Sequence, residues 1–346
     1  MASQKQFDAV PPFPDNLQTV ELSTIPLAGL ISGDTKVAEQ LFAACQDLGF
    51  FLLDLRGDHL GEEIINEIDQ LLNLSMEALN LPEEVKKRFP VTPGKSILGF
   101  KPRGSSVTET RQQDRYEMLN IAQDGLMGVT DLQPLPDILL DKRRLLTSYM
   151  KHGHVIITAI CRTLSDQLKI PTETFADLHP ANKSSGTTIR MIKAFACTKA
   201  EERRTSMIHH TDFGTITLLA NVIGGLQVLP AGELLDENAW RWVRPQPGLL
   251  IVNLGDVFVQ WTGRILRSNV HRIRYAPGEQ QNLDRYSLAI VGRPMSSATM
   301  KRIHNLGVPS EEETDKTVLE YEWYKMGLVK QGKWEMKTRG GRVISA

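Results

Sequence analysis

The chain has 346 residues, of which 41% are hydrophobic and 23% are charged, the composition of an ordinary globular protein with ample apolar material for a core. Lysine and arginine number 40 and aspartate and glutamate 41, so the net charge of −1 gives no electrostatic reason to expect nucleic acid or an anionic membrane as partner. The polar, proline-rich first residues and the lack of any run of ~18 apolar residues predict neither a signal peptide nor a membrane span, and three widely spaced cysteines predict buried thiols. We therefore expect a cytoplasmic protein.

The first half of the chain predicts helices around a strand. Apolar residues recur at helical spacing over three stretches, residues 35–48, 59–80 and 136–168. Asp34 is placed to cap the first turn of the first stretch. The sequence "FFLLDL" (50–55) is typical of a buried strand, and residues 90–115, rich in Gly, Pro, Ser and Thr, predict a loop and a candidate lid.

The second half of the chain consists of short β-rich runs punctuated by Gly, Pro or Asn. They are "TTIRMIKAFAC", "GTITLLA", "GLQVL", "WRWVR", "GLLIVNLG", "DVFVQWTG", "RSNVHRIR" and "RYSLAIVG". Many short strands with regular turn signals indicate a sandwich or barrel of the jelly-roll type. We therefore predict an α+β fold in one structural unit. Its parts are a helical and mixed region over 1–180, a double-stranded β-helix (jelly-roll) core over 181–300, and a C-terminal helix (316–328) with a basic tail within 301–346.

Three polar residues predict a metal site. His210 and Asp212, in "HHTDFGTITLL", stand two positions apart, so an extended chain places both side chains on one face. His271, in "RSNVHRIR", is the candidate third ligand. Two histidines and one carboxylate leave three coordination positions open, as in non-haem Fe(II) oxygenases, although these ligands also suit Zn(II) or Mn(II). His209 points the opposite way and is interpreted as a bystander.

A second pair narrows the choice of metal. Arg285 and Ser287, in "DRYSLAI", also stand two positions apart in a strand-like run. A guanidinium and a hydroxyl on one face form a clamp for a carboxylate. A dicarboxylate such as 2-oxoglutarate could chelate iron with its keto-acid end and place its far carboxylate on this clamp. The pair therefore favours an iron oxygenase.

These motifs together resemble a known family. The pattern "HTDFGTITLL…GGLQVLP…WVRPQPGLLIVNLGD…GRILRSNVHRI…RYSLAIVGRP" is similar to the catalytic core of the 2-oxoglutarate/Fe(II)-dependent dioxygenases of the isopenicillin N synthase-like superfamily, and most of all to fungal members of secondary metabolism. The sequence "IPLAGL…AEQLFAACQDLGFFLL" resembles that family's N-terminal region. The resemblance implies that His210, Asp212 and His271 bind Fe(II), that Arg285 and Ser287 bind 2-oxoglutarate, and that O₂ is consumed.

One stretch departs from the family's pattern. Many plant members carry Asn-Tyr-Tyr after an Arg-Met or Arg-Leu pair, and these polar groups help to hold the keto-acid end. Here "IRMIKAF" has Ile192, Lys193 and Ala194 in those places. Arg190 and Lys193 lie on opposite faces of a regular strand, so at most one of them faces the pocket. Arg190 is the candidate contact to the substrate or the cosubstrate.

We predict an Fe(II)- and 2-oxoglutarate-dependent oxygenase acting on a small natural-product intermediate as a monomer or homodimer. It would hydroxylate, desaturate or oxidatively rearrange this substrate and release succinate and CO₂. The alternative is a non-haem iron oxidase of the same fold that uses no 2-oxoglutarate, because such enzymes use an Arg-x-Ser clamp for a substrate carboxylate. A non-catalytic jelly-roll binding protein or a metallohydrolase is a more remote alternative.

Overall fold

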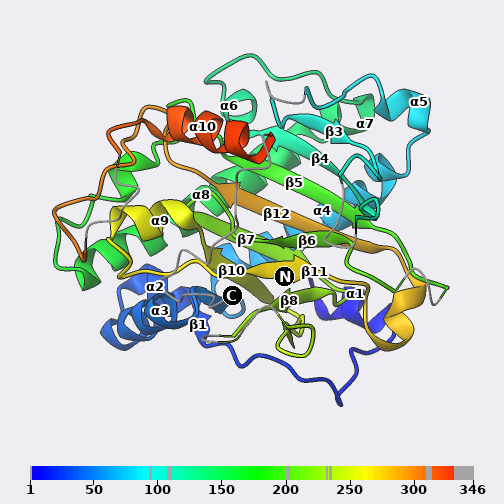
Figure 1. Ribbon diagram of the computed structural model, residues 1–346, viewed down its shortest axis with the longest axis horizontal. Coiled ribbons are helices and arrows are strands. Elements are labelled where there is room, and N and C mark those ends of the chain that lie inside the picture. The colour runs from blue at the N-terminus through cyan, green and yellow to red at the C-terminus, as the bar shows by residue number, and fades with distance from the viewer. Residues whose placement is uncertain are drawn as a thin grey trace.

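Two facing β-sheets and a layer of helices make up the protein, whose computed structural model describes residues 2–92, 96–106, 111–199, 203–230, 233, 236–308 and 314–330 (Figure 1). In this part of the chain the larger sheet runs, from edge to edge, β1 (Thr24–Pro26), β2 (Phe50–Asp54), β10 (Leu249–Leu254), β7 (Ile216–Asn221), β12 (Arg285–Gly292), β5 (Thr188–Ala194), β4 (Tyr116–Ala122) and β3 (Gly99–Lys101). The smaller sheet runs β6 (Met207–His210), β11 (His271–Ile273), β8 (Leu226–Val228) and β9 (Arg241–Trp242). This architecture confirms the predicted α+β fold with a jelly-roll core.

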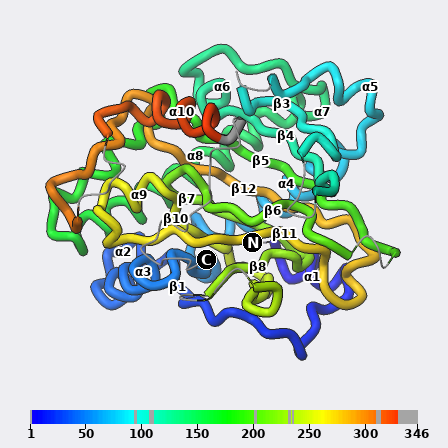
Figure 2. Tube along the Cα trace, in the orientation of Figure 1, coloured from blue at the N-terminus to red at the C-terminus, as the bar shows by residue number. Residues whose placement is uncertain are grey.

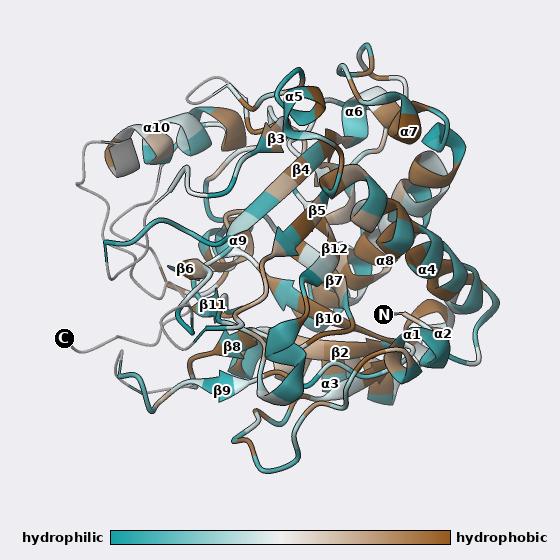
Figure 3. Ribbon diagram, turned by 90° about the vertical axis from the view of Figure 1, so that its right-hand side faces the viewer, coloured by the Kyte–Doolittle hydropathy of each residue, from teal (hydrophilic) through white to brown (hydrophobic). Residues whose placement is uncertain are grey.

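Two long helices, α4 (His59–Leu79) and α8 (Arg143–Gln167), cover the face of the larger sheet that lies opposite the smaller sheet (Figure 3). Both contact β12. Gly153 lets α8 approach the sheet, because a Cβ at this position would collide with Cδ1 of Ile290. The shorter helices are α1 (Gln4–Asp8), α2 (Leu27–Ser32), α3 (Thr35–Asp47), α5 (Glu83–Lys86), α6 (Gln123–Leu126), α7 (Asp137–Leu140), α9 (Asp256–Trp261) and α10 (Val318–Lys330). No helix in the described ranges has both the length and the apolar character that crossing a membrane requires.

Local sequence signals account for several of these elements. The predicted cap of α3 is present, since Asp34 Oδ1 accepts hydrogen bonds from the backbone N–H groups of Lys36 at 2.8 Å and Val37 at 3.2 Å. The predicted strand at 50–55 is β2, and the predicted helices at 59–80 and 316–328 are α4 and α10. Cys45, Cys161 and Cys197 are all buried, as expected.

Two elements differ from the sequence prediction. Residues 136–168 do not form one helix, because Lys142 leaves the helical region (φ −101°, ψ 14°) between α7 and α8. The run "DVFVQWTG", expected to be a strand, forms α9 instead. A short apolar run that is buried on all sides satisfies either element. In α9, Phe258 and Trp261 lie three positions apart and both pack on Phe175, with ring centroids 5.0 Å and 5.9 Å away.

The N-terminal region adds strands to both edges of the larger sheet. Strands β1 and β2 precede β10 at one edge of the sheet, and β4 and β3 follow β5 at the other edge, as Figure 2 shows for β3, β4 and β5. Segments far apart in the sequence are therefore neighbours in one sheet. The expected loop at 90–115 contributes β3 to this sheet, while its residues 93–95 and 107–110 lie outside the described part of the chain. The basic tail predicted at the C-terminus lies outside it as well from residue 331 onward. The division of the chain at residues 180 and 300 stays a prediction.

Alternation along the strands gives the larger sheet two different faces. Arg285 and Ser287 of β12 lie on the face toward the smaller sheet, which we call the inner face, whereas Ile290 packs in the core beneath the helices. In the antiparallel register of β12 and β5, Arg190 pairs with Ala289. Arg190 therefore shares the inner face with Arg285 and Ser287.

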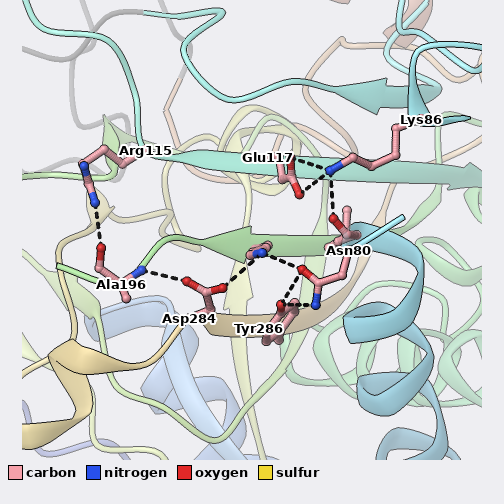
Figure 4. Close-up of polar contacts among 9 residues, drawn as sticks. Asn80, Lys86, Arg115, Glu117, Ala196, Asp284 and Tyr286 are labelled. Atoms are coloured by element: carbon pink, nitrogen blue, oxygen red, sulfur yellow. Dashed lines mark hydrogen bonds and ion pairs between the residues drawn. The ribbon is translucent and has the colours of Figure 1, made fainter. Parts of the chain in front are cut away.

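Lys193 belongs to a polar network on the opposite, outer face, and Figure 4 shows its partners Asn80 and Asp284 together with Tyr286. Its Nζ donates to Asn80 Oδ1 at 2.6 Å, at the end of α4, and lies 3.0 Å from Asp284 Oδ2. Asn80 in turn donates to the Tyr286 hydroxyl at 2.9 Å. These bonds join α4, β5 and the start of β12, so Lys193 supports the strand that carries the clamp and does not enter the pocket.

His179 gives the fold a pH dependence with a definite sign. Its ring bonds the Phe175 carbonyl at 2.7 Å through Nδ1 and the Thr215 hydroxyl at 2.8 Å through Nε2, and burial lowers its pKa to about 4. The unfolded chain binds this proton at a higher pH, ~6.5, than the folded protein does. The contribution of His179 to stability is therefore complete above pH ~6.5 and is lost as the pH falls toward about 4, by up to ~3 kcal/mol.

We expect His179→Gln to remove the part of the pH-dependent stability that His179 contributes. Urea unfolding measured at roughly pH 7.5 and pH 5 should show a smaller loss of stability on acidification in the variant than in the natural protein. Equal losses in the two proteins would contradict the assignment.

Candidate metal and cosubstrate site

The structure brings His210, Asp212 and His271 together. His210 ends β6 and His271 begins β11, and the two residues pair directly in the smaller sheet. Their ring centroids lie 4.4 Å apart, and their Nε2 atoms lie 3.8 Å and 3.9 Å from Asp212 Oδ1. The candidate ligand atoms of all three residues lie within 4.8 Å of one another. This is a compact set of two imidazole nitrogens and one carboxylate oxygen.

Hydrogen bonds occupy Nδ1 of His210 and His271 and leave Nε2 of each ring available to a metal. The Nδ1 atoms of His210 and His271 lie 2.9 Å and 3.1 Å from the carbonyl oxygens of Ile208 and Asn269. A carbonyl only accepts, so each Nδ1 carries the proton and each Nε2 keeps its lone pair for a metal.

Asp212 is fixed in the same way. Its Oδ2 accepts from the Thr217 hydroxyl at 2.7 Å and from Asn253 Nδ2 at 2.9 Å, both on the inner face of the larger sheet. Oδ1 remains directed toward the two imidazoles. The larger sheet thus orients the carboxylate, while the smaller sheet supplies the histidines.

Electrostatics favour a divalent cation at this point. Burial and the neighbouring His271 lower the pKa of His210 to about 4, so its imidazole is neutral at physiological pH. Burial raises the pKa of Asp212, but His271, His210 and the two hydrogen bonds outweigh it and hold that pKa below its ordinary value. One carboxylate oxygen and two imidazole nitrogens, brought together in this way, fit Fe(II).

Thr217 is expected to support metal binding through Asp212. Replacing it with valine removes the 2.7 Å hydrogen bond to Oδ2 and keeps the shape of the side chain. We expect Fe(II) affinity to fall ~10–100-fold in Thr217→Val, whereas Thr217→Ser keeps the hydroxyl and most of the affinity. Anaerobic Fe(II) titration measures both, and equal affinities for the two variants would contradict this role.

Asp256 links the C-terminal helix to the segment between the ligands. Its carboxylate accepts from the hydroxyls of Thr211 at 3.0 Å and Ser268 at 2.8 Å, and Lys325 Nζ of α10 lies 3.3 Å from it. The backbone N–H of Asp256 also donates to the Asp212 carbonyl at 2.8 Å. Docking of α10 is therefore coupled to the position of "HTD". No signal in the sequence indicates this role, because the run that begins at Asp256 predicts a strand.

Arg285 and Ser287 form the expected pair, and the pair has an unused hydrogen-bond donor. Arg285 donates to the Ser287 hydroxyl at 3.1 Å through one Nη atom and to the Ile223 carbonyl at 3.2 Å through Nε. Its second Nη atom is buried without a hydrogen-bond partner among the described residues. Burial lowers the pKa of Arg285 to about 10, and no carboxylate among the described residues compensates its charge. A buried guanidinium with an unused donor fits the far carboxylate of 2-oxoglutarate.

The inner face of β5 is apolar where many plant relatives are polar. Ile192 and Ala194 occupy this face, and Ala194 pairs with Arg285 on one side and with Tyr116 of β4 on the other. Tyr116 thus lies on the inner face at the level of the clamp, a position that sequence reasoning missed. His209 lies outside the ligand cluster, with its ring centroid 6.3 Å from that of Trp240.

Comparison with known proteins gives the family. Residues 189–294 match the model of the 2OG-Fe(II) oxygenase superfamily, and residues 19–134 match that of the non-haem dioxygenase in morphine synthesis N-terminal region. A 2-oxoglutarate-dependent dioxygenase of Aspergillus fumigatus is 30% identical over 313 residues, which cover 85% of this chain and 80% of the relative. The chain belongs to the 2OG-Fe(II) oxygenase superfamily. This oxygenase is also similar to the 2-oxoglutarate-dependent dioxygenase frbH of Dothideomycetidae sp., at 31% identity over 299 residues covering 85% and 88% of the two chains.

Solved structures share the fold of this oxygenase. A full-length Neurospora crassa protein in complex with alpha-KG superposes with a TM-score of 0.73 at 19% identity, covering 90% of this chain and 99% of that one. JOX2 in complex with 2OG, Fe and JA gives a TM-score of 0.72 at 20% identity, covering 100% and 98%. The chain is thus a 2-oxoglutarate-dependent dioxygenase, and Fe(II), 2-oxoglutarate and O₂ are the cofactors of its family.

Proposed function

We propose that this dioxygenase oxidises a small natural-product intermediate by hydroxylation, desaturation or oxidative ring rearrangement, with release of succinate and CO₂. His210, Asp212 and His271 would hold Fe(II), and Arg285 with Ser287 would hold the far carboxylate of 2-oxoglutarate. The observation that carries the proposal is the convergence of three free ligand atoms within 4.8 Å on a face that also presents an unused donor of a buried arginine.

The protein residues perform definite tasks in this scheme. The two carbonyl-bonded imidazoles and Asp212 would supply three ligand atoms to the metal, and a metal with three protein ligands could also bind 2-oxoglutarate and O₂. Bound Fe(II) and 2-oxoglutarate supply the oxidising chemistry when O₂ arrives. Arg285 and Ser287 fix the far end of the cosubstrate and so orient its keto-acid end toward the ligands.

A cavity on the inner face of the same sheet supports a small-molecule substrate. It has a volume of about 860 Å³ and lies between the inner faces of β3, β4 and β5 and the C-terminal helix α10. This volume is typical of pockets for small ligands. Two solved relatives of this fold carry thymine and JA in their complexes, which agrees with a substrate of this size class. A cytoplasmic location and a monomeric or homodimeric state stay predictions.

The dependence on 2-oxoglutarate tests the proposal against the oxidase alternative. Fe(II)-loaded enzyme should consume O₂ and release succinate only when 2-oxoglutarate is present, slowly without substrate and faster with one. O₂ consumption coupled to substrate oxidation in the absence of 2-oxoglutarate would support the alternative oxidase and overturn our proposal. Addition of 2-oxoglutarate to the anaerobic Fe(II) enzyme should also produce the weak visible charge-transfer band of a chelate.

A further inference from the structure

Arg190 is a cation held in a fixed orientation with part of its donor capacity unused. Its Nε donates to Asn120 Oδ1 at 2.8 Å, and Asn120 Nδ2 donates to the Ile97 carbonyl at 2.7 Å. These two bonds set the plane of the guanidinium. In the described part of the chain, no protein group accepts a hydrogen bond from the two Nη atoms of Arg190, and the residue is only partly buried. An arginine prepared in this way presents a fork to an anion.

The position of Arg190 lies between the candidate metal ligands and the cavity. Arg190 pairs with Ala289 of β12, which lies between Ser287 and Val291 on the inner face. Val291 in turn pairs with Thr217, the residue whose hydroxyl binds Asp212. Arg190 stands one strand further from β7, on the side of β4, whose inner face lines the cavity.

The charges near Arg190 are otherwise engaged. Asp212 is the carboxylate whose charge acts most strongly on Arg190. Its free oxygen faces the two imidazoles, and its negative charge would be neutralised by a bound metal ion. Glu322 of α10 pairs with Arg293. Burial raises the pKa of Tyr116 to about 12, so its phenol is neutral. With Fe(II) bound, the guanidinium of Arg190 therefore lacks a counterion among the described residues.

The cavity beyond Arg190 is mainly apolar. Its lining includes Met118 on β4 and Thr188, which lies two positions along β5 from Arg190. Leu98 lines it from the segment before β3, and Trp323 and Met326 line it from α10. Charged residues also line the cavity, but each has a partner: Lys101 pairs with Asp114, Arg293 pairs with Glu322, and Asp124 accepts from the Ser184 hydroxyl. A ligand that fills this space would therefore place an apolar body between the sheet and α10.

We propose that Arg190 binds an acidic group of the substrate beside the metal, and that the enzyme oxidises carboxylic acids with an apolar body that occupies the cavity under α10. This inference rests on the proposed function, because it takes the metal and the cosubstrate to lie at the residues given above. It assigns the anion at Arg190 to the substrate and not to the keto-acid end of 2-oxoglutarate, since the bond to Asn120 turns Arg190 toward β4, whose inner face lines the cavity.

Matched pairs of simple ligands test the inference without knowledge of the natural substrate. The anaerobic enzyme with Fe(II) and 2-oxoglutarate is titrated with 4-phenylbutanoic acid and decanoic acid and with the primary amide of each. We expect each acid to bind at least ~10-fold more tightly than its amide, because a hydrogen bond from a guanidinium to a carboxylate is stronger than one to an amide. Arg190→Gln should abolish this preference, and Arg190→Lys should keep part of it.

Lys193→Gln is the matched control, because it removes a cation from the same strand on the outer face. It should keep the preference for the acids. No preference in the natural enzyme, or a preference that survives in Arg190→Gln, would overturn the inference. Loss of 2-oxoglutarate affinity in Arg190→Gln, seen in the charge-transfer band, would reassign Arg190 to the cosubstrate and would also overturn it. The absence of the charge-transfer band in the natural enzyme would instead contradict the proposed function itself.

Discussion

Replacing His210 with alanine is expected to reduce Fe(II)-dependent turnover of 2-oxoglutarate by at least ~10³-fold, because a metal that loses one of three protein ligands loses several kcal/mol of binding and positioning. The imidazole of His210 is neutral and its Nε2 faces Asp212 Oδ1 at 3.8 Å. No other described histidine or carboxylate joins the cluster to take its place. The readouts are succinate release, Fe(II) affinity and the charge-transfer band of the anaerobic complex.

The adjacent histidine provides a control with the same chemistry. His209 lies outside the ligand cluster and near Trp240, so His209→Ala should bind Fe(II) and turn over 2-oxoglutarate like the natural enzyme. Melting curves of both metal-free variants check that the fold is intact. If His210→Ala kept the band and the activity, or if His209→Ala lost them, the assignment of the iron ligands would be wrong.

Arg285→Met is expected to raise the dissociation constant for 2-oxoglutarate by about 10²- to 10³-fold, because it removes the charge and the unused donor that face the cosubstrate. The same change should make the metal-free protein more stable by roughly 1–2 kcal/mol, since methionine avoids the cost of a buried cation but leaves the Ile223 carbonyl without its donor. The lowered pKa of Arg285, about 10, supports this expected gain in stability. It means that the charged guanidinium is less favourable in the folded protein than in the unfolded chain at pH 7.

These opposite effects separate a binding role from a structural one. A structural arginine would lower stability when removed, whereas this one should lower cosubstrate affinity and raise the melting temperature. Ser287→Ala should weaken 2-oxoglutarate binding only ~10-fold, the effect of one hydrogen bond to a charged group. Arg162→Met, at a surface ion pair with Glu173, is the control and should change neither quantity. A destabilised Arg285→Met protein with normal 2-oxoglutarate affinity would refute the clamp.

Local spacing in the sequence determined the parts of the site that depend on neighbouring residues. In an extended segment, His210 and Asp212 share a face, and so do Arg285 and Ser287, because side chains alternate along a strand. The same alternation separated Arg190 from Lys193. Helical periodicity and the Asp34 cap likewise placed α3 and α4.

Only the tertiary structure decided the features that depend on contacts between distant segments. Thr217 and Asn253 come from two neighbouring strands, and nothing in the sequence around either residue indicates that both bind Asp212. The run that forms α9 could not be assigned from its apolar pattern, because burial on every side erases the periodicity that separates a helix from a strand. The unused donors of Arg190 and Arg285 could be identified only from the positions of all neighbouring acceptors in the described structure. Whether a donor has a partner depends on the packing of the fold and not on the local sequence.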